Sequence, residues 1–203
     1  AIDPVIEQYG HGERPIDVAF VGGYSRHHSA RGRTLEQVAA LAADRNIVFC
    51  LDASRLTRLA ESAVGRLLPL GKHRRPDVIA RIARTPLFGR DLYELFGSAK
   101  IVLNGAIDMA GNDRGNMRCF EAMGCGSLLV SDAGNYPEAM QDGVTMRTYD
   151  VRERDVEAIS SSLQDWPQWA GIAETGRARV QGTYSKAWQW AQFIDLVARI
   201  EPC

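Results

Sequence analysis

Residues 112–138 decide the fold, and they read NDRGNMRCFEAMGCGSLLVSDAGNYPE. This order predicts a glycine-containing loop, a short helix over 117–123, a tight turn and a buried strand over 127–131. The helix carries apolar side chains at every third position, which places them on one face. Gly124 and Gly126 end it, because glycine tolerates the positive φ that a helix stop often needs. The stretch therefore predicts backbone amides, an arginine and a carboxylate at the mouth of a parallel sheet.

Arg118 and Glu121 are three residues apart, so they lie on the same side of this helix. Two interpretations are open. One is a surface ion pair that stabilises the helix by about 0.2–0.5 kcal/mol. The other is a ligand site, which the surrounding glycines favour because they let a ligand approach the backbone closely.

The upstream sequence alternates between strand and helix. Residues 16–23 predict a strand that ends in two glycines, residues 34–43 a helix, and residues 46–51 a second strand. This order is typical of a parallel sheet with right-handed crossovers. We expect a Rossmann-like three-layer α/β/α fold with a mostly parallel sheet. Further expected elements are helices over 77–83, 91–96, 135–140, 155–164, 166–180 and 186–200, strands over 100–104 and 145–149, and a short strand within 66–70.

The loop over 24–33 is a candidate phosphate site. Gly22 and Gly23 come just before it, and glycines let a phosphate approach the backbone. Arg31 and Arg33 could supply charge-assisted hydrogen bonds of about 1.5–3 kcal/mol each. The spacing matches neither a Gly-x-Gly-x-x-Gly motif nor a Walker loop. A solvated loop with incidental arginines explains the segment equally well.

Composition bounds the function only loosely. The chain has 203 residues, 45% of them hydrophobic, and a formal net charge of −1. That charge gives no general attraction to nucleic acid, so we expect no nucleic-acid partner. The four cysteines show no metal-ligand spacing, and we expect a reducing cytoplasm and no metal. No apolar run approaches the ~20 residues that span a bilayer, and no signal peptide is evident.

The ends of the chain suggest how it is organised. It begins with Ala1 rather than methionine, so a processed or truncated chain is one interpretation, with a partner domain missing. We expect residues 1–15 to be a linker or N-terminal extension and residues 16–203 to form one domain. Near the end, apolar side chains including Trp190 and Phe193 recur at helical spacing, and we expect them to form a packed core face.

Residues 118–126 read RCFEAMGCG. They resemble the Arg-x-Phe-Glu-Ala-x-x-x-Gly block of the CgeB-like (spore-maturation-protein-like) glycosyltransferases, which have the GT-B fold. The strand end at 20–23, the segment 93–104 and the tail 176–184 fit the same family in order. A GT-B enzyme has two Rossmann-like halves, and this chain resembles the C-terminal half, which binds the sugar donor.

The resemblance implies roles for individual residues. The second carboxylate of the family's Glu-x7-Glu pair matches Glu121, a ligand of ribose hydroxyls, and the first falls on Asp113, a catalytic contact to the donor sugar. Arg33, or Arg31, matches the basic residue that neutralises the leaving diphosphate, and Arg118 contacts phosphate or orients Glu121. The implied catalytic residues are Asp113 and Arg33. The implied substrate-binding residues are Gly22, Gly23, Arg31, Arg33, Gly115, Asn116, Met117, Arg118 and Glu121.

The implied activity is metal-independent transfer of a sugar from a nucleotide-diphosphate sugar, with no cofactor beyond that donor. The acceptor is open: a glycan, a lipid, a protein or a small molecule. As one half of an enzyme, the chain is expected to lack an N-terminal acceptor domain and to be inactive alone. Three alternatives remain: a noncatalytic nucleotide- or sugar-binding module, a sugar-nucleotide epimerase, and a flavodoxin-like interaction domain.

Overall fold

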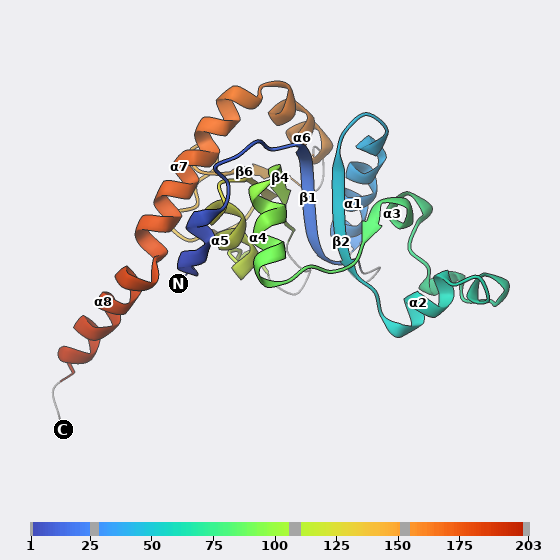
Figure 1. Ribbon diagram of the computed structural model, residues 1–203, viewed down its shortest axis with the longest axis horizontal. Coiled ribbons are helices and arrows are strands. Elements are labelled where there is room, and N and C mark those ends of the chain that lie inside the picture. The colour runs from blue at the N-terminus through green and yellow to red at the C-terminus, as the bar shows by residue number, and fades with distance from the viewer. Residues whose placement is uncertain (1, 25–28, 106–110, 151–154, 201–203) are drawn as a thin grey trace.

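The protein has three layers, with helices on both faces of a six-stranded sheet (Figure 1). The computed structural model describes residues 2–24, 29–105, 111–150 and 155–200. The strands are β1 (Ile16–Gly23), β2 (Ile47–Asp52), β3 (Ala83–Arg84), β4 (Ala99–Leu103), β5 (Leu128–Asp132) and β6 (Arg147–Tyr149). The α-helices are α1 (Ser29–Ala40), α2 (Arg55–Glu61), α3 (Asp77–Ile82), α4 (Gly89–Gly97), α5 (Met117–Gly124), α6 (Asp155–Gln164), α7 (Trp166–Tyr184) and α8 (Lys186–Ala198).

The strand order is β3-β2-β1-β4-β5-β6, and every neighbouring pair is parallel. This is the order of a doubly wound Rossmann sheet, in which the chain leaves β1 in one direction and resumes beside it at β4. The point of reversal lies between β1 and β4, and ligands of such sheets bind outside the carboxyl ends of the strands there. The predicted fold class is confirmed.

Alternating side chains on the strands build two cores. In β1, Val18 and Phe20 face one layer, while Ala19 and Val21 face the other. The first layer contains α1, α3 and α6, and the second contains α4 and α5. Because both faces are covered, each central strand is a continuous apolar run rather than an alternating one.

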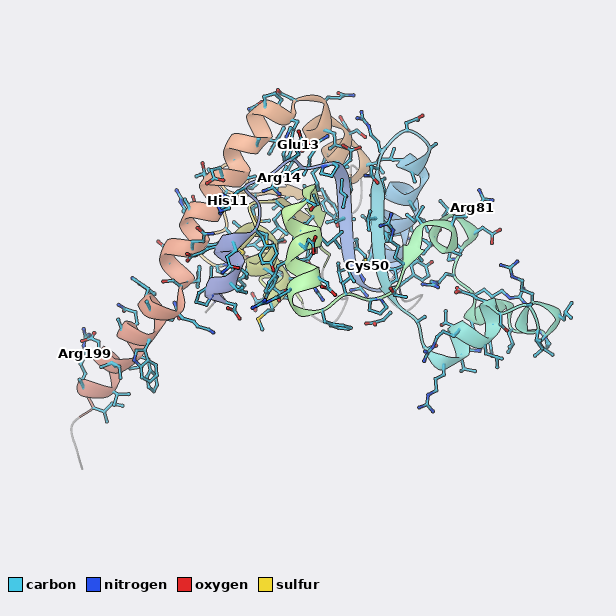
Figure 2. All side chains as sticks on the ribbon, in the orientation of Figure 1. His11, Glu13, Arg14, Cys50, Arg81 and Arg199 are labelled. Atoms are coloured by element: carbon cyan, nitrogen blue, oxygen red, sulfur yellow. The ribbon has the colours of Figure 1, made fainter. Side chains whose placement is uncertain are left out.

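The N-terminal segment packs on the domain rather than hanging free. Ile2 and Ile6 are buried in the second core, on the short 3₁₀-helix η1 (Pro4–Gln8) and beside it. Arg14 and His11 lie between the sheet and α7 (Figure 2). The Arg14 guanidinium donates to the carbonyls of Ala99 at 2.7 Å and Cys125 at 3.1 Å. The predicted domain boundary after residue 15 stays a prediction.

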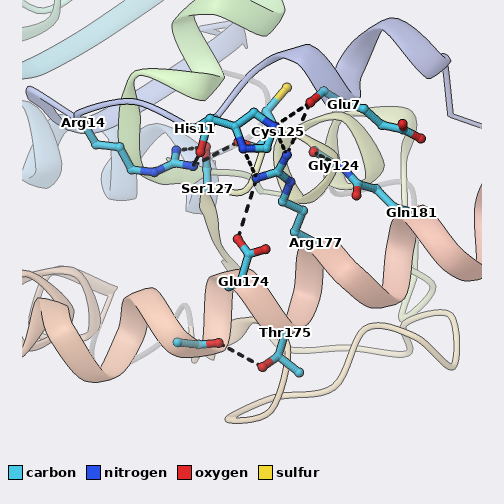
Figure 3. A network of polar contacts seen from close by, with 12 residues as sticks. Glu7, His11, Arg14, Gly124, Cys125, Ser127, Glu174, Thr175, Arg177 and Gln181 are labelled. Carbon is cyan, nitrogen blue, oxygen red and sulfur yellow. Dashed lines mark hydrogen bonds and ion pairs between the residues drawn. The ribbon is translucent and has the colours of Figure 1, made fainter.

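A second arginine closes the same network (Figure 3). Arg177 of α7 is 6% exposed, and its Nη2 lies 2.7 Å from His11 Nε2. Burial, and then the charge of Arg177, lower the pKa of Arg14. The Arg14 guanidinium nevertheless stays charged, because arginine loses its proton only at extreme pH. Two cations therefore share this buried seam, and backbone carbonyls rather than carboxylates provide most of their partners.

Three sequence predictions are wrong in detail. The first helix begins at Ser29, not residue 34, so Arg31 and Arg33 belong to α1 instead of a loop. Residues 65–67 form a 3₁₀-turn instead of a strand, because Arg74 takes their carbonyls as hydrogen-bond acceptors. Residues 135–140 form no helix, since Pro137 disfavours a helical conformation for the residue before it; only residues 138–139 make a turn.

The predicted core face of α8 is also wrong. The helix extends away from the body of the domain (Figure 1), and none of its described residues is buried. Trp190 is 63% exposed and stacks on Phe193, itself 52% exposed. The helical spacing of the apolar residues was interpreted correctly, but the domain places no layer against them.

Candidate functional site

A cleft of about 690 Å³ opens at the carboxyl ends of the strands, beside the neighbouring strands β1 and β4. This volume is within the usual range for small-molecule sites. Its floor is the end of β1 and of β4, one wall is the start of α4, and the other wall is the start of α5 with the loop before it. The lining residues are Phe20, Val21, Gly22, Arg31, Phe88, Gly89, Leu92, Asn104, Gly105, Asp113, Arg114, Gly115, Asn116, Met117, Arg118 and Glu121.

The amino end of α5 is held firmly against the sheet. Asn116 caps the helix, and its Oδ1 accepts a hydrogen bond from the Cys119 amide at 3.3 Å. Its Nδ2 donates to Asn104 Oδ1 at 3.2 Å, and Asn104 Nδ2 donates to Ser131 Oγ at 3.1 Å. The first amides of a helix have no intrahelical partner, so those of residues 117 and 118 are directed out of the helix end.

The loop that enters α5 requires a glycine. Gly115 has a φ of +101°, a conformation that residues with a Cβ rarely adopt. A Cβ there would also come within 2.7 Å of Pro137 Cδ. The backbone at residue 115 therefore packs against the ring of Pro137 without room for a side chain. This close packing holds the loop in place where it enters α5.

Arg118 and Glu121 form an ion pair across one turn of α5, with 3.8 Å between Nη1 and Oε2. Burial raises the pKa of Glu121, and the charge of Arg118 opposes part of that shift. The Glu121 carboxylate is thus short of solvation, although it faces the cleft. Such a group gains from hydrogen-bond donors that a ligand supplies.

A second pair orders the loop before α5. Arg114 Nε donates to Asp132 Oδ2 at 2.7 Å, and the same guanidinium donates to the Gly111 carbonyl at 2.7 Å. Next to it, the exposed Asp113 carboxylate accepts a hydrogen bond from Asn135 Nδ2 at 3.3 Å. These contacts connect the loop to the end of β5 and position Asp113 at the edge of the cleft.

Most residues predicted for the site line this one cleft: Gly22, Arg31, Asp113, Gly115, Asn116, Met117, Arg118 and Glu121. Gly23 and Arg33 are not among the described residues that line it. Arg33 is exposed on α1, whereas Arg31, two residues earlier on the same helix, lines the cleft. A Cβ built on Gly105 would lie 3.3 Å from the Arg31 side chain. His27 and His28, which the sequence predicts to be solvent-facing loop histidines rather than metal ligands, lie outside the described residues.

Sequence reasoning missed several lining residues. Asn104 follows an apolar strand, and a polar residue at the carboxyl end of a central strand was an available indication. Phe88 is 71% exposed at the rim and directly precedes α4. A single aromatic residue in a Pro-Leu-Phe-Gly turn does not indicate a ligand site from sequence alone. Arg114 was noted only as part of the loop, because its partner Asp132 is eighteen residues away in the chain.

The two buried thiols of α5 and its C-cap are not poised as nucleophiles. Burial raises the pKa of Cys119, and likewise of Cys125, to about 12. Across the ranges that the structure describes, no group of three or more His, Cys, Asp or Glu side chains is arranged to hold a metal ion. No helix within those ranges combines the length and apolar character needed to cross a membrane.

The fold and the cleft define the class of protein: a doubly wound Rossmann-like domain with a ligand-sized cleft at the carboxyl ends of its strands. The "Glycosyl transferase-like" family model matches residues 54–195, well over half of the chain. The chain therefore belongs to this glycosyltransferase-like family. No curated protein matches the sequence.

Solved structures of glycosyltransferases share the fold at low identity. Anabaena Alr3699/HepE, solved with UDP and glucose, is 17% identical with a TM-score of 0.61 over 98% of this chain and 53% of its own. The C-terminal domain of the group 1 glycosyltransferase LpcC from Francisella tularensis is 12% identical, with a TM-score of 0.60 over 92% of this chain and 100% of that domain. Sucrose-phosphate synthase from Thermosynechococcus elongatus is 18% identical, with a TM-score of 0.57 over 90% of this chain and 45% of its own. This chain spans about half the length of the Anabaena protein.

Proposed function

We propose that the chain is the donor-binding half of a CgeB-like glycosyltransferase, which transfers a sugar from a nucleotide-diphosphate sugar to an acceptor. Family membership supports the reaction class. The observation that carries the proposal is the meeting of Arg31, Arg118 and Glu121 in one cleft at the switch point of the sheet. A cleft with two cations, one poorly solvated carboxylate and a helix amino end suits a ligand that has both phosphates and hydroxyls.

The diphosphate is assigned to the amino end of α5. The helix dipole is equivalent to about +0.5 elementary charge there, and the amides of Met117 and Arg118 are free of intrahelical partners. Arg31, on α1, lines the same cleft. Of the two arginines implied by the family resemblance, the proposal takes Arg31, because Arg33 is exposed away from the lining. A role for Arg33 stays a prediction.

The sugar-nucleoside end is assigned to three further residues. Glu121 accepts hydrogen bonds from the ribose hydroxyls, which replace the solvation that its carboxylate lacks. Asp113, on the exposed edge of the cleft, contacts the donor sugar. Phe88 offers an aromatic face at the rim for the base, and stacking of a base on an aromatic ring is worth about 1–3 kcal/mol.

The reaction breaks the bond between the anomeric carbon of the sugar and the terminal diphosphate oxygen. The electron pair of that bond goes to the diphosphate, so negative charge grows on the leaving group. An acceptor hydroxyl forms the new bond to the anomeric carbon and gives its proton to a base. Fixed amides of α5 and the Arg31 guanidinium lower the barrier because they face the growing charge before the reaction begins. We propose that these groups do so without a divalent ion.

The acceptor and its base are assigned to a second half that this chain does not contain. The Anabaena neighbour of known structure is about twice as long as the matched region. The alternatives differ in a measurable way. A binding module predicts nucleotide affinity without turnover by the full-length protein, and an epimerase predicts isomerisation of the nucleotide sugar without any acceptor.

Calorimetric titration of this chain with UDP, GDP, ADP and TDP tests the donor site. We expect one of them to bind, and UDP is the first to try because the Anabaena neighbour was solved with it. Glu121→Ala should weaken binding by about 10–100-fold, the loss of a charged hydrogen-bonding pair. Glu94→Ala is the control, since Glu94 is an exposed glutamate of α4 outside the lining. Equal affinity of both variants, or no affinity of the wild type for any diphosphate, would overturn the proposal.

A further inference from the structure

Residues 54–76 form an arm that projects from the sheet edge beyond β2 and α3 (Figure 1). We call these residues the basic arm. It contains α2, followed by two 3₁₀-turns, η3 (Gly65–Leu67) and η4 (Gly71–His73). It leaves the carboxyl end of β2, so it starts on the same edge of the sheet as the cleft.

The basic arm has its own internal fastening. The Arg74 guanidinium donates to the carbonyls of Ala60, Gly65 and Leu68 at 3.1, 2.8 and 3.1 Å. Arg75 Nη2 contacts Glu61 Oε2 at 2.6 Å. The backbones are so close that a Cβ on residue 65 would lie 1.8 Å from the Leu59 carbonyl oxygen. These contacts show an ordered element rather than a loose loop.

What this ordered element presents to solvent is apolar. Leu67 is 88% exposed and Val64 67% exposed, in and just before η3. Leu56 and Leu59, three residues apart on α2, are about half exposed, as is Leu68. The contacts described above use arginines, backbone carbonyls and the Glu61 carboxylate, so they do not depend on these five side chains.

The basic arm also carries a strong positive charge. Residues 54–76 contain six arginines and lysines and one acidic residue, Glu61, for a net charge of +5 in a chain of net charge −1. Arg74 and Arg75 are used internally. The remaining cations are exposed beside the apolar side chains: Arg55, Arg58, Arg66 and Lys72.

We propose that the basic arm docks the protein on an anionic lipid surface. Helix geometry places Leu56 and Leu59 on one face of α2, with Arg55 and Arg58 along its flank. Leucines beside cations suit the boundary between acyl chains and anionic headgroups, where apolar burial and charge attraction act together. Nucleic acid also attracts cations, but it has no apolar layer in which five exposed aliphatic side chains could be buried. Because the arm leaves the same edge as the cleft, docking holds the cleft near the membrane surface.

Flotation with vesicles tests the arm, and it needs no nucleotide. The vesicles contain phosphatidylcholine alone, or have about a third of the lipid replaced by phosphatidylglycerol to supply the anionic surface. We expect the full chain to bind only the anionic vesicles, and added salt to weaken that binding. Arg58→Ser with Arg66→Ser should reduce partitioning by about thirtyfold, at about 1 kcal/mol per cation. Val64→Ser with Leu67→Ser should reduce it by more than about tenfold.

Two matched variants separate the arm from the rest of the surface. Arg45→Ser with Arg81→Ser removes two exposed arginines elsewhere, and Trp190→Ser with Phe193→Ser removes exposed aromatics of α8. Neither should change vesicle binding. The proposal is overturned if wild-type protein ignores anionic vesicles, if it binds RNA instead, or if the α8 variant rather than the arm variants abolishes binding. All variants are of exposed residues, and unchanged melting confirms that they fold.

Discussion

Arg114 and Asp132 form an ion pair at the carboxyl end of β5, with 2.7 Å between Nε and Oδ2. Their side chains are 12% and 7% exposed, so the pair lies almost out of solvent. The pair is one of the contacts that attach the loop before α5 to the sheet, beside the backbone hydrogen bonds that join Asn135 to residues 112 and 114. It therefore helps to position Asp113 and Gly115, the neighbours of Arg114 in the chain, in the cleft.

Arg114→Met should lower the free energy of unfolding by about 3 kcal/mol, because it removes the cation from a nearly buried carboxylate. Urea denaturation measures this. Arg118→Met is the control: its partner Glu121 lies at 3.8 Å and both are more exposed, so the expected loss is below about 1 kcal/mol. Adding Asp132→Asn to Arg114→Met should restore part of the stability. Equal losses for the two arginines would mean that the buried pair contributes little.

Glu121 should make stability depend on pH in the direction opposite to most carboxylates. Its pKa is raised in the folded state, so between the unfolded and folded pKa values the folded protein binds more protons. Stability therefore falls as pH rises through that window. Glu121→Gln should melt at the same or a higher temperature than wild type at pH 7, and the difference should disappear on acidification.

Thermal denaturation from about pH 4 to 8 checks the sign across the usual titration range of glutamate. Glu94→Gln, an exposed change on α4, should show no such trend. A Glu121→Gln variant that is less stable at pH 7 than at pH 4, relative to wild type, would mean that the carboxylate is better solvated than its burial indicates.

The sequence allowed the sheet and the site edge to be predicted because both depend on local patterns. Apolar runs indicated the strands, and glycines at the end of β1 and around α5 marked the places of close backbone approach. Arg118 and Glu121 were found because helical spacing fixes which residues are neighbours. Gly115 and Asn116, at the start of α5, were implied by the family resemblance rather than by spacing.

Contacts between distant parts of the chain could not be predicted in this way. The Arg14 and Arg177 network brings together residues more than 160 positions apart. Neither segment contains a sequence pattern that predicts contact with the other. The Arg114–Asp132 pair was missed for the same reason. Arg31 could not be distinguished from Arg33 until α1 was found to begin at Ser29, because one half-turn of helix decides which side chain faces the cleft.

Two glycines of α7 should respond to alanine with opposite signs. A Cβ on Gly176 would lie 2.3 Å from the Thr145 carbonyl oxygen and 3.0 Å from Met123 Cε, so Gly176→Ala should cost about 1–3 kcal/mol. A Cβ on Gly171 meets nothing within 4 Å, and Gly171→Ala should stabilise by about 0.5–1 kcal/mol through helix propensity. Urea unfolding of the pair measures both. A stabilising Gly176→Ala would show that α7 lies further from the sheet than described.

Deleting α8 should leave the domain folded. None of its described residues is buried, and its aromatic side chains, including Trp190 and Phe193, are exposed. A chain that stops after Ser185 loses almost no packing, so its free energy of unfolding should change by less than about 1 kcal/mol. It should also bind less of a dye that reports exposed apolar surface. Trp190→Ser with Phe193→Ser keeps the helix and separates loss of apolar surface from loss of the segment. A large loss of stability on deletion would mean that α8 folds back against the domain in solution, and the exposed aromatics would then be core after all.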